Sequence, residues 1–376
     1  MDVPADCDFM SVGIPQVKEG QNCQVRFIAT NANGESSSNI VTLTVGPRLT
    51  FAPERANCLY ERHTTYLGSF TIPKESATGM GRDAGYGGNA LAIADNGAAM
   101  YIGCRQREEG QTSGGARKGY GKISIPEIGG EASWLIDSDF FVYDPTYGHE
   151  NGKDAGSEYV RGGLVWGDEI ILTPCIWYDN KGNEGYTAFS VSLDLQTWGP
   201  MRRADYLAHD SKKPFVNGYM CHVPPEWQAT IGWPTLVGNC HMSIASGCAN
   251  GFSVWGFHPD QLLATSGLDN PYPIEPFMAH ELGLELVERT WTEMHHTGWR
   301  NPGPCPPPNT VWQAGDDVCG MCWPEGTDTI LMVGTVGTGQ NTYKIKGETT
   351  SGSGRAAEPY RRQIWAFDAN DFMKVK

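Results

Sequence analysis

The sequence predicts an all-β protein whose larger part is a β-propeller, and three observations support this fold class. Glycine accounts for 47 and proline for 24 of the 376 residues, so long helices have little room. The 12 Trp, 15 Tyr and 13 Phe supply a large apolar core and exclude a disordered chain. A repeat of short strands separated by turns recurs along most of the chain, which is typical of propeller blades.

The repeat combines a glycine-led inner strand, a second strand and an outer strand that ends in a turn. Residues 87–93, for example, form an inner strand that turns at 95–97 into a second strand at 99–104. The outer-strand signatures begin at Gly68, Gly121, Phe189, Val254 and Ile364. The last interval is wide enough for two units, so five blades are favoured, six are possible, and a pair of β-sandwiches is the competing fold. Pairing of residues 67–72 with 363–367 is expected to close the ring.

The first 46 residues differ from the rest and form a separate module. Residues 23–31 alternate as a strand, Asn33-Gly34 makes a turn, and β-branched residues fill 38–45. These residues resemble the last two strands of a fibronectin type III or related immunoglobulin-like domain, with Cys23 in place of the usual aromatic. The resemblance implies half of such a domain at 1–46, either the tail of a longer chain or a truncated module. A linker at 47–59 and the propeller at 60–376 follow.

Charge and cysteine usage limit the partners and cofactors. The formal net charge is −15 and no run of Lys and Arg occurs, so we expect no nucleic-acid partner. No apolar run is long enough to cross a bilayer, so we expect no membrane insertion. The 11 cysteines include Cys319-Gly-Met-Cys322 but no second such pair, so we expect neither a metal site nor any other cofactor. A disulfide that uses Cys305 is the alternative for a protein that works outside the cell.

The start of the chain lacks the charged and apolar segments of a signal peptide. Export would then occur within an assembly, by a non-classical route, or as part of a longer chain.

Three stretches of the predicted propeller carry a second resemblance. Residues 86–93, 223–239 and 360–372 resemble a group of poorly characterised propeller-like proteins among tailed-phage structural proteins and bacterial proteins of unknown function. The resemblance implies a virion or extracellular surface protein, such as a subunit of a phage tail fibre or capsid appendage. It also implies virion or appendage proteins as partners, and a homo-oligomer.

One turn resembles a motif of known propeller enzymes. Residues 192–198, Ser-Leu-Asp-Leu-Gln-Thr-Trp, are similar to the S-x-D-x-x-x-T-W turn of sialidases and to a turn of five-bladed glycosidases. The match to the sialidase pattern lacks the glycine and is one residue short. In those families the turn lies at the outer edge of a blade, so the resemblance implies a structural role and no catalysis.

The candidate ligand site follows from propeller topology, because the loops before the inner strands line one axial face. The residues expected there are Tyr86, Asn89, Arg161, Trp177, Tyr178, His241, His296, Trp299, Arg300 and Asp317. A sugar site needs flat aromatic faces with convergent polar groups. Trp166 and Trp233 are further candidates for such faces, although most propeller tryptophans pack between blades.

Three functions remain open at the level of sequence. The favoured function is a non-enzymatic surface protein that contacts a cell-surface glycan or a protein, with no catalytic residue assigned. The alternative is a glycoside hydrolase, which needs two carboxylates about 5–10 Å apart. The acids available for it are Glu158, Asp168, Glu293, Asp316 and Asp317. The second alternative is a purely structural assembly subunit.

Overall fold

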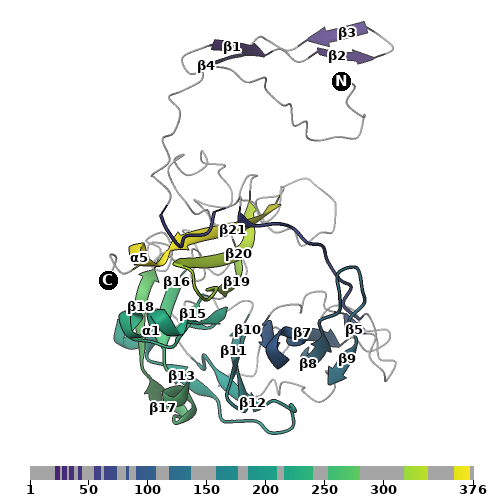
Figure 1. Cartoon of the computed structure of the whole chain (residues 1–376). Helices are drawn as coiled ribbons and strands as arrows, with labels where there is room; N and C mark the ends of the chain where they lie inside the picture. The colour runs from purple at the N-terminus through teal and green to yellow at the C-terminus, as the bar shows by residue number, and fades with distance from the viewer. Residues whose placement is uncertain are drawn as a thin grey trace, which may run out of the picture. The chain divides into compact units, whose positions relative to one another are not determined.

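The computed structural model describes part of the chain in detail. The described residues are 22–25, 28–31, 34–37, 41–44, 55–60, 63–73, 82–83, 90–106, 118–136, 158–176, 185–209, 216–239, 253–279, 317–337 and 360–372. The chain divides into two compact units, Met1–Ala56 and Asn57–Lys376, with the division inside the expected linker. Strands dominate both units, and the helices are short, which confirms the all-β class (Figure 1).

The first unit contains two short antiparallel ladders. Strand β2 (Ile28–Asn31) pairs with β3 (Gly34–Ser37), and β1 (Asn22–Val25) pairs with β4 (Val41–Thr44). Ile28 faces Ser37 and Asn31 faces Gly34, and the expected Asn33-Gly34 turn lies at this end of the ladder. Both ladders join the segment 22–31 to the segment 34–44, so together they form one antiparallel hairpin.

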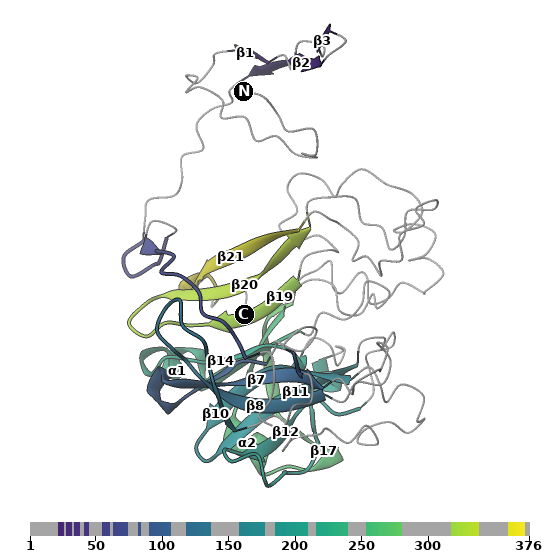
Figure 2. The same ribbon diagram turned by 90° about the vertical axis from the view of Figure 1, so that its right-hand side faces the viewer.

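The described part of the second unit contains four antiparallel sheets that follow one another along the chain. The first sheet contains β5 (Arg82–Asp83), β6 (Ala92–Ala94), β7 (Ala99–Gln106), β8 (Lys118–Ser124) and β9 (Trp134–Ile136). The second contains β10 (Glu158–Trp166), β11 (Glu169–Ile176) and β12 (Phe189–Ser192). The third contains β14 (Met220–His222), β15 (Thr235–Gly238), β16 (Ser253–Phe257) and β18 (Ile274–Ala279). The fourth contains β19 (Asp317–Cys322), β20 (Thr329–Gly337) and β21 (Tyr360–Asp368), which lie side by side in Figure 2.

A few smaller elements complete the second unit. Strands β13 (Arg202–Ala204) and β17 (Gly267–Tyr272) form a parallel pair beside the second and third sheets. The α-helices among the described residues are α1 (Pro225–Ile231), α2 (Pro259–Leu263) and α5 (Ala369–Phe372). Both α1 and α2 begin with proline, whose fixed backbone angle suits the first helical position.

Four of the five predicted strand signatures lie on strands of these four sheets, whereas the signature that begins at Gly68 does not lie on a strand. The outer-strand signatures that begin at Gly121, Phe189, Val254 and Ile364 fall on β8, β12, β16 and β21. Each of these strands is the third in a meander of consecutive antiparallel strands: β6-β7-β8, β10-β11-β12, β14-β15-β16 and β19-β20-β21. The same chain direction and strand order therefore recur four times within the described residues.

The expected ring closure is wrong for the described residues. Thr71 forms a parallel bridge with Glu131: its N–H donates to Gly130 O at 2.9 Å, and its carbonyl accepts from Ala132 N–H at 2.8 Å. Residues 67–72 thus lie against the first sheet, whereas β21 pairs with β20. The physical reason is apolar burial, because Phe70 and Ile72 pack against the outer face of the first sheet.

Apolar cores lie between successive sheets. In β11, Ile170 and Leu172 pack toward the first sheet with Tyr101, while the intervening Ile171 packs toward the third sheet with Trp255. This alternation is the period of a strand with two buried faces. A third core joins the third and fourth sheets, and the first strands follow the same order: β10 lies against β6 and β14, and β14 lies against β19.

The contact between the second and third sheets depends on glycine. A Cβ at Gly162 in β10 would overlap the carbonyl O of Gly218, which already accepts a 2.7 Å hydrogen bond from Thr173 Oγ1. Beside it, Asn217 Nδ2 donates to Pro174 O at 2.9 Å. These buried polar groups are paired across the two sheets, so their separation cannot increase without loss of hydrogen bonds.

We expect Gly162→Ala to lower the free energy of unfolding by about 1–3 kcal/mol, because the added methyl must displace the backbone at Gly218. Chemical denaturation measures this change. Gly320→Ala in β19 is the matched control, since nothing lies within 4 Å of the Cβ position there. The control should stay within about 0.5 kcal/mol of the wild type. Equal stability of the two variants would contradict the role given to Gly162.

Candidate functional site

Most residues of the expected axial site lie outside the described residues. These are Tyr86, Asn89, Trp177, Tyr178, His241, His296, Trp299 and Arg300. Asp317 begins β19, and Arg161 stands at a bulge of β10 between Val160 and Gly162. Both residues are on the first strands of their sheets, and both of these strands lie against β14. Of the ten residues expected at the axial site, only Arg161 and Asp317 thus lie among the described residues.

The acids considered for a glycosidase are also only partly described. Glu158 begins β10, and Asp168 is exposed in the turn between β10 and β11. Glu293 and Asp316 lie outside the described residues. A different group of side chains, which combines tryptophan, histidine and acidic residues, is well described at the surface of the second unit.

One half of this group is centred on Trp166, the last residue of β10. Its indole Nε1–H donates to Asp260 Oδ1 at 2.8 Å, and its ring stacks on His222 with centroids 5.9 Å apart and planes 19° apart. His222 ends β14, and Asp260 lies in the first turn of α2. Three separate elements therefore hold the indole by its edge and by one face.

The other half has the same composition and is centred on Trp233, just before β15. Its indole Nε1–H donates to Glu275 Oε2 at 2.7 Å, and its ring lies 4.9 Å from that of His258. The ring sits over Gly256 in β16, where any Cβ would overlap it. Glycine at this position is what allows Trp233 to lie close to the sheet.

The two halves meet at the start of α2 and lie at one end of the third sheet. His258 and Asp260 flank Pro259, and the register aligns His222, Thr235, Phe257 and Ile274 across the four strands. We call this group the aromatic–acid surface, and its members are Trp166, His222, Trp233, His258, Asp260 and Glu275. His222 and Asp260 are exposed, and the other four are half-buried.

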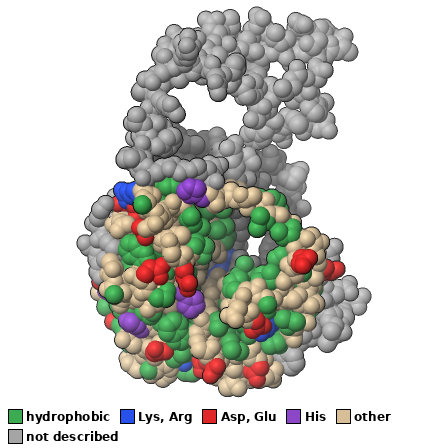
Figure 3. Space-filling model, in the orientation of Figure 1, with side chains coloured by type: hydrophobic (Ala, Val, Ile, Leu, Met, Phe, Trp, Pro, Cys, Tyr) green, Lys and Arg blue, Asp and Glu red, His purple; other side chains and the backbone are tan. Residues whose placement is uncertain are grey.

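The electrostatics of this surface favour donor groups on a ligand. Desolvation lowers the pKa of His222 although part of its side chain is exposed, and a hydrogen bond to the backbone of Val165 opposes this shift, so the neutral imidazole is favoured. Carboxylates only accept hydrogen bonds, and each of these two already orients an indole. On the face of the second unit drawn in Figure 3, acidic and histidine side chains adjoin apolar ones.

Sequence reasoning found the two tryptophans of this surface but missed His222, His258, Asp260 and Glu275. Three of the four lie in strands or helices far apart in sequence, and only the third-sheet register brings them together. The one local signal is His258-Pro259-Asp260, an acid in the first turn of a helix that begins with proline.

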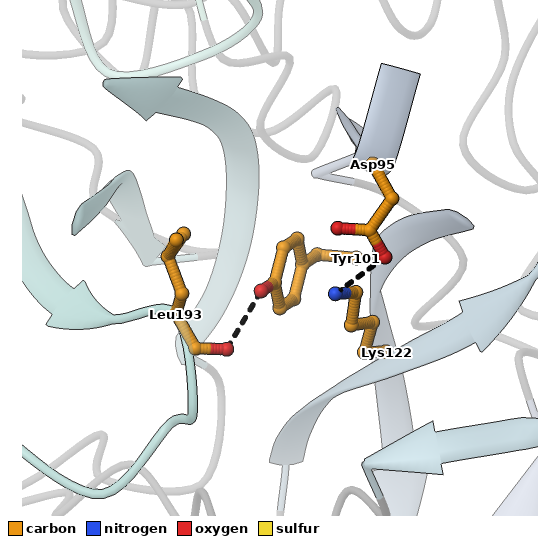
Figure 4. Close-up of polar contacts among 4 residues, drawn as sticks. All are labelled: Asp95, Tyr101, Lys122 and Leu193. Atoms are coloured by element: carbon orange, nitrogen blue, oxygen red, sulfur yellow. Dashed lines mark hydrogen bonds and ion pairs between the residues drawn. The ribbon is translucent and has the colours of Figure 1, made fainter. Parts of the chain in front are cut away.

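A second polar cluster joins the first and second sheets (Figure 4). Tyr101 Oη donates to Leu193 O at 2.6 Å, Lys122 Nζ pairs with Asp95 Oδ2 at 2.7 Å, and Lys122 Nζ lies 5.3 Å from the centre of the Tyr101 ring. Burial raises the pKa of Tyr101 despite the opposing charge of Lys122. Burial opposes the charge of Lys122, but hydrogen bonding to Asp95 prevails and its pKa is raised. Because Tyr101 is fully buried, this cluster is a packing contact between sheets.

The turn at residues 192–198 closes on itself. Ser192 Oγ donates to Asp194 Oδ1, Thr197 N–H donates to Ser192 Oγ at 3.0 Å, and Gln196 N–H donates to Asp194 Oδ1 at 3.0 Å. Leu195 takes a left-handed φ of 61°. The polar groups of the turn are used within the turn, as its expected structural role requires.

Four cysteines of the described part are free thiols. Cys221 is buried, Cys58 is half-buried, and Cys319 and Cys322 are exposed on β19. Within the described residues, no group of three or more His, Cys, Asp or Glu side chains is placed to hold a metal ion. Cys305, of the alternative disulfide, lies outside them. The helices of the described part are all too short to cross a membrane.

We expect Tyr101→Phe to lower the free energy of unfolding by about 1–2 kcal/mol, because the partly buried carbonyl of Leu193 loses its donor. Denaturant unfolding measures the change. Tyr66→Phe is the control, since Tyr66 is 83% exposed and its hydroxyl is hydrated in either state. If both variants unfold like the wild type, the inter-sheet hydrogen bond does not contribute to stability.

The lowered pKa of His222 predicts a loss of stability in acid. As the pH falls below about 6.5, the unfolded chain takes up a proton at this position before the folded protein does. Stability therefore decreases down to the folded pKa, and His222→Gln should flatten this part of the profile. Thermal unfolding between pH 7.5 and 5 measures the slope. Trp166→Ala, which removes the ring stacked on His222, should flatten it as well; an unchanged slope in both variants would contradict the assignment.

No protein-family model, no curated protein and no solved structure matches the chain. The resemblances to fibronectin-like modules, phage proteins and sialidase turns therefore stay predictions from the sequence.

Proposed function

We propose that the second unit is a propeller-type binding module that contacts a glycan through the aromatic–acid surface and catalyses no reaction. The propeller, with five blades favoured, is supported by the recurring meander and by the order of the first strands, β6, β10, β14 and β19. Apolar cores between neighbouring sheets are the packing that stacked blades need. In this proposal the four sheets are consecutive blades.

The observation that carries the binding function is the pair of indoles held by carboxylates, Trp166 with Asp260 and Trp233 with Glu275. An indole fixed at its N–H edge presents a ring face at little cost in side-chain entropy, and sugar C–H faces pack on such rings. The same carboxylates accept from donors on a ligand. Neutral or amino sugars supply hydroxyl or ammonium donors, whereas sialylated or sulfated glycans bring negative charge to a protein of net charge −15.

A hydrolase needs one carboxyl group as the acid and a second as base or nucleophile across the scissile bond. On the aromatic–acid surface each carboxylate is instead engaged with a tryptophan. This arrangement fits positioning of a ligand better than chemistry on it.

The biological setting in this proposal is the surface of a virion or another extracellular assembly. The first unit, as part of a fibronectin- or immunoglobulin-like module, would attach or space the binding unit. Its partners would be virion or appendage proteins and further copies of the same chain. The resemblances in residues 20–45, 86–93, 223–239 and 360–372 support this setting, and the acidic charge argues against a nucleic-acid role.

A glycan array with the full chain tests the proposal. We expect binding to neutral or amino sugars, a loss of about tenfold or more in Trp166→Ala and Trp233→Ala, and no release of reducing sugar. Leu135→Ala is the control, because Leu135 is an exposed apolar residue on the first sheet, 52% exposed. Binding that survives both tryptophan substitutions would contradict this surface, and hydrolysis of a bound glycan would favour the enzyme alternative.

A further inference from the structure

The start of α2 contacts both tryptophans of the aromatic–acid surface. Asp260, in its first turn, accepts the indole N–H of Trp166 at 2.8 Å, and the ring of His258, just before the helix, has its centroid 4.9 Å from that of Trp233. A helix of five residues is not stable by itself, so its position depends on what holds it in the folded protein. Leu262 anchors α2 in the core between the second and third sheets, and hydrogen bonds at its ends then set its direction.

The far end of α2 is held by Arg202, a buried residue of β13. Its guanidinium donates from Nη2 to Leu263 O at 3.3 Å and from Nε to Thr265 O at 3.1 Å. Carbonyls in the last turn of a helix have no partner within the helix, and a positive charge there also suits the helix dipole. Arg202 thus caps α2 from outside the helix.

Arg202 is itself fixed on several sides. Its Nη1 donates to Pro200 O at 2.8 Å and to Ser190 Oγ at 3.2 Å, and its backbone N–H donates to Ala188 O at 2.8 Å. A Cβ at Gly199 would lie 3.3 Å from both Nη1 and Nη2, so the guanidinium has little room to move. The group therefore joins β12 of the second sheet to the end of α2.

A guanidinium in this place contributes geometry more than stability. Burial lowers the pKa of Arg202, and the negative charge of Glu169 opposes this shift, so the hydrogen bonds of the group must offset a desolvation cost. The planar guanidinium presents its donors in fixed directions, and here they reach acceptors in three chain segments. A lysine ammonium, which is a compact charge on a flexible stem, cannot span the same acceptors.

We propose that Arg202 is the positioning residue of the aromatic–acid surface. By fixing the end of α2, it sets where His258 and Asp260 meet the two tryptophans. Arg202 is 3% exposed, so it acts through α2 and does not contact a ligand itself. The inference rests on the proposed function for the role of this surface, but the position of α2 can be measured without a ligand.

The indole N–H signals in two-dimensional NMR spectra of the ¹⁵N-labelled full chain test the position of α2. Arg202→Lys keeps the charge but loses the fork of donors, so the signals of Trp166 and Trp233, which contact the start of α2, should shift. The signal of Trp323 should stay in place, because its indole N–H donates to Thr327 O at 3.0 Å, away from α2.

A second variant keeps the test decisive if Arg202→Lys does not fold. Gly199→Ala retains Arg202 but presses on its guanidinium, and it should shift the same two surface signals. Arg203→Lys is the matched control, because neighbouring side chains of a strand point to opposite faces, and it should leave all the signals in place. Unchanged surface signals in both test variants, or an equal shift of the Trp323 signal, would overturn the positioning role.

Glycan binding separates this inference from the proposed function. We expect Arg202→Lys to weaken binding about three- to tenfold, because the surface is displaced and not removed. Shifted surface signals with an unchanged affinity would overturn the positioning role. A wild type that binds no glycan contradicts only the proposed function, and the NMR signals then still decide whether Arg202 holds α2.

Discussion

The close approach of neighbouring sheets at their first strands is the constraint on which the second unit depends. At Gly162 the backbone of β10 meets that of Gly218 with no room for a side chain, and Thr173 and Asn217 hydrogen-bond across the same junction. This spacing lets alternate residues of a single strand, such as Ile170 and Ile171 in β11, enter two different cores. Apolar burial then stabilises the stack of sheets, because each sheet covers a face that its neighbour could not bury alone.

The sequence allowed prediction of the local structure better than of the long-range contacts. Strand, turn and strand recur in a pattern that four sheets share, since period-two alternation and glycine turns are local properties. The partner of residues 67–72 was predicted wrongly, because Phe70 and Ile72 can satisfy their burial against any apolar face, and the first sheet offers one.

For the aromatic–acid surface, too, the sequence predicts single residues better than the long-range contacts between them. Trp166 and Trp233 could be named from the sequence because flat aromatic faces are few and large. Their carboxylate and histidine neighbours come from β14, α2 and β18, which are brought together only by strand pairing in the third sheet. Trp255, by contrast, is 2% exposed within the core, so the type of residue alone does not separate a binding tryptophan from a packing one.

The order of the meanders also bears on how the chain folds. Each of the four sheets is made from one continuous stretch, so its hydrogen bonds join residues that leave the ribosome close together in time. Such local connectivity favours rapid formation of each sheet, and every new sheet finds the previous one already presenting an apolar face. The parallel pair β13–β17 is the exception, because its second strand follows the first by most of the third sheet. Synthesis from the N-terminus thus assembles the described cores one after another, with the core between the third and fourth sheets after the other two.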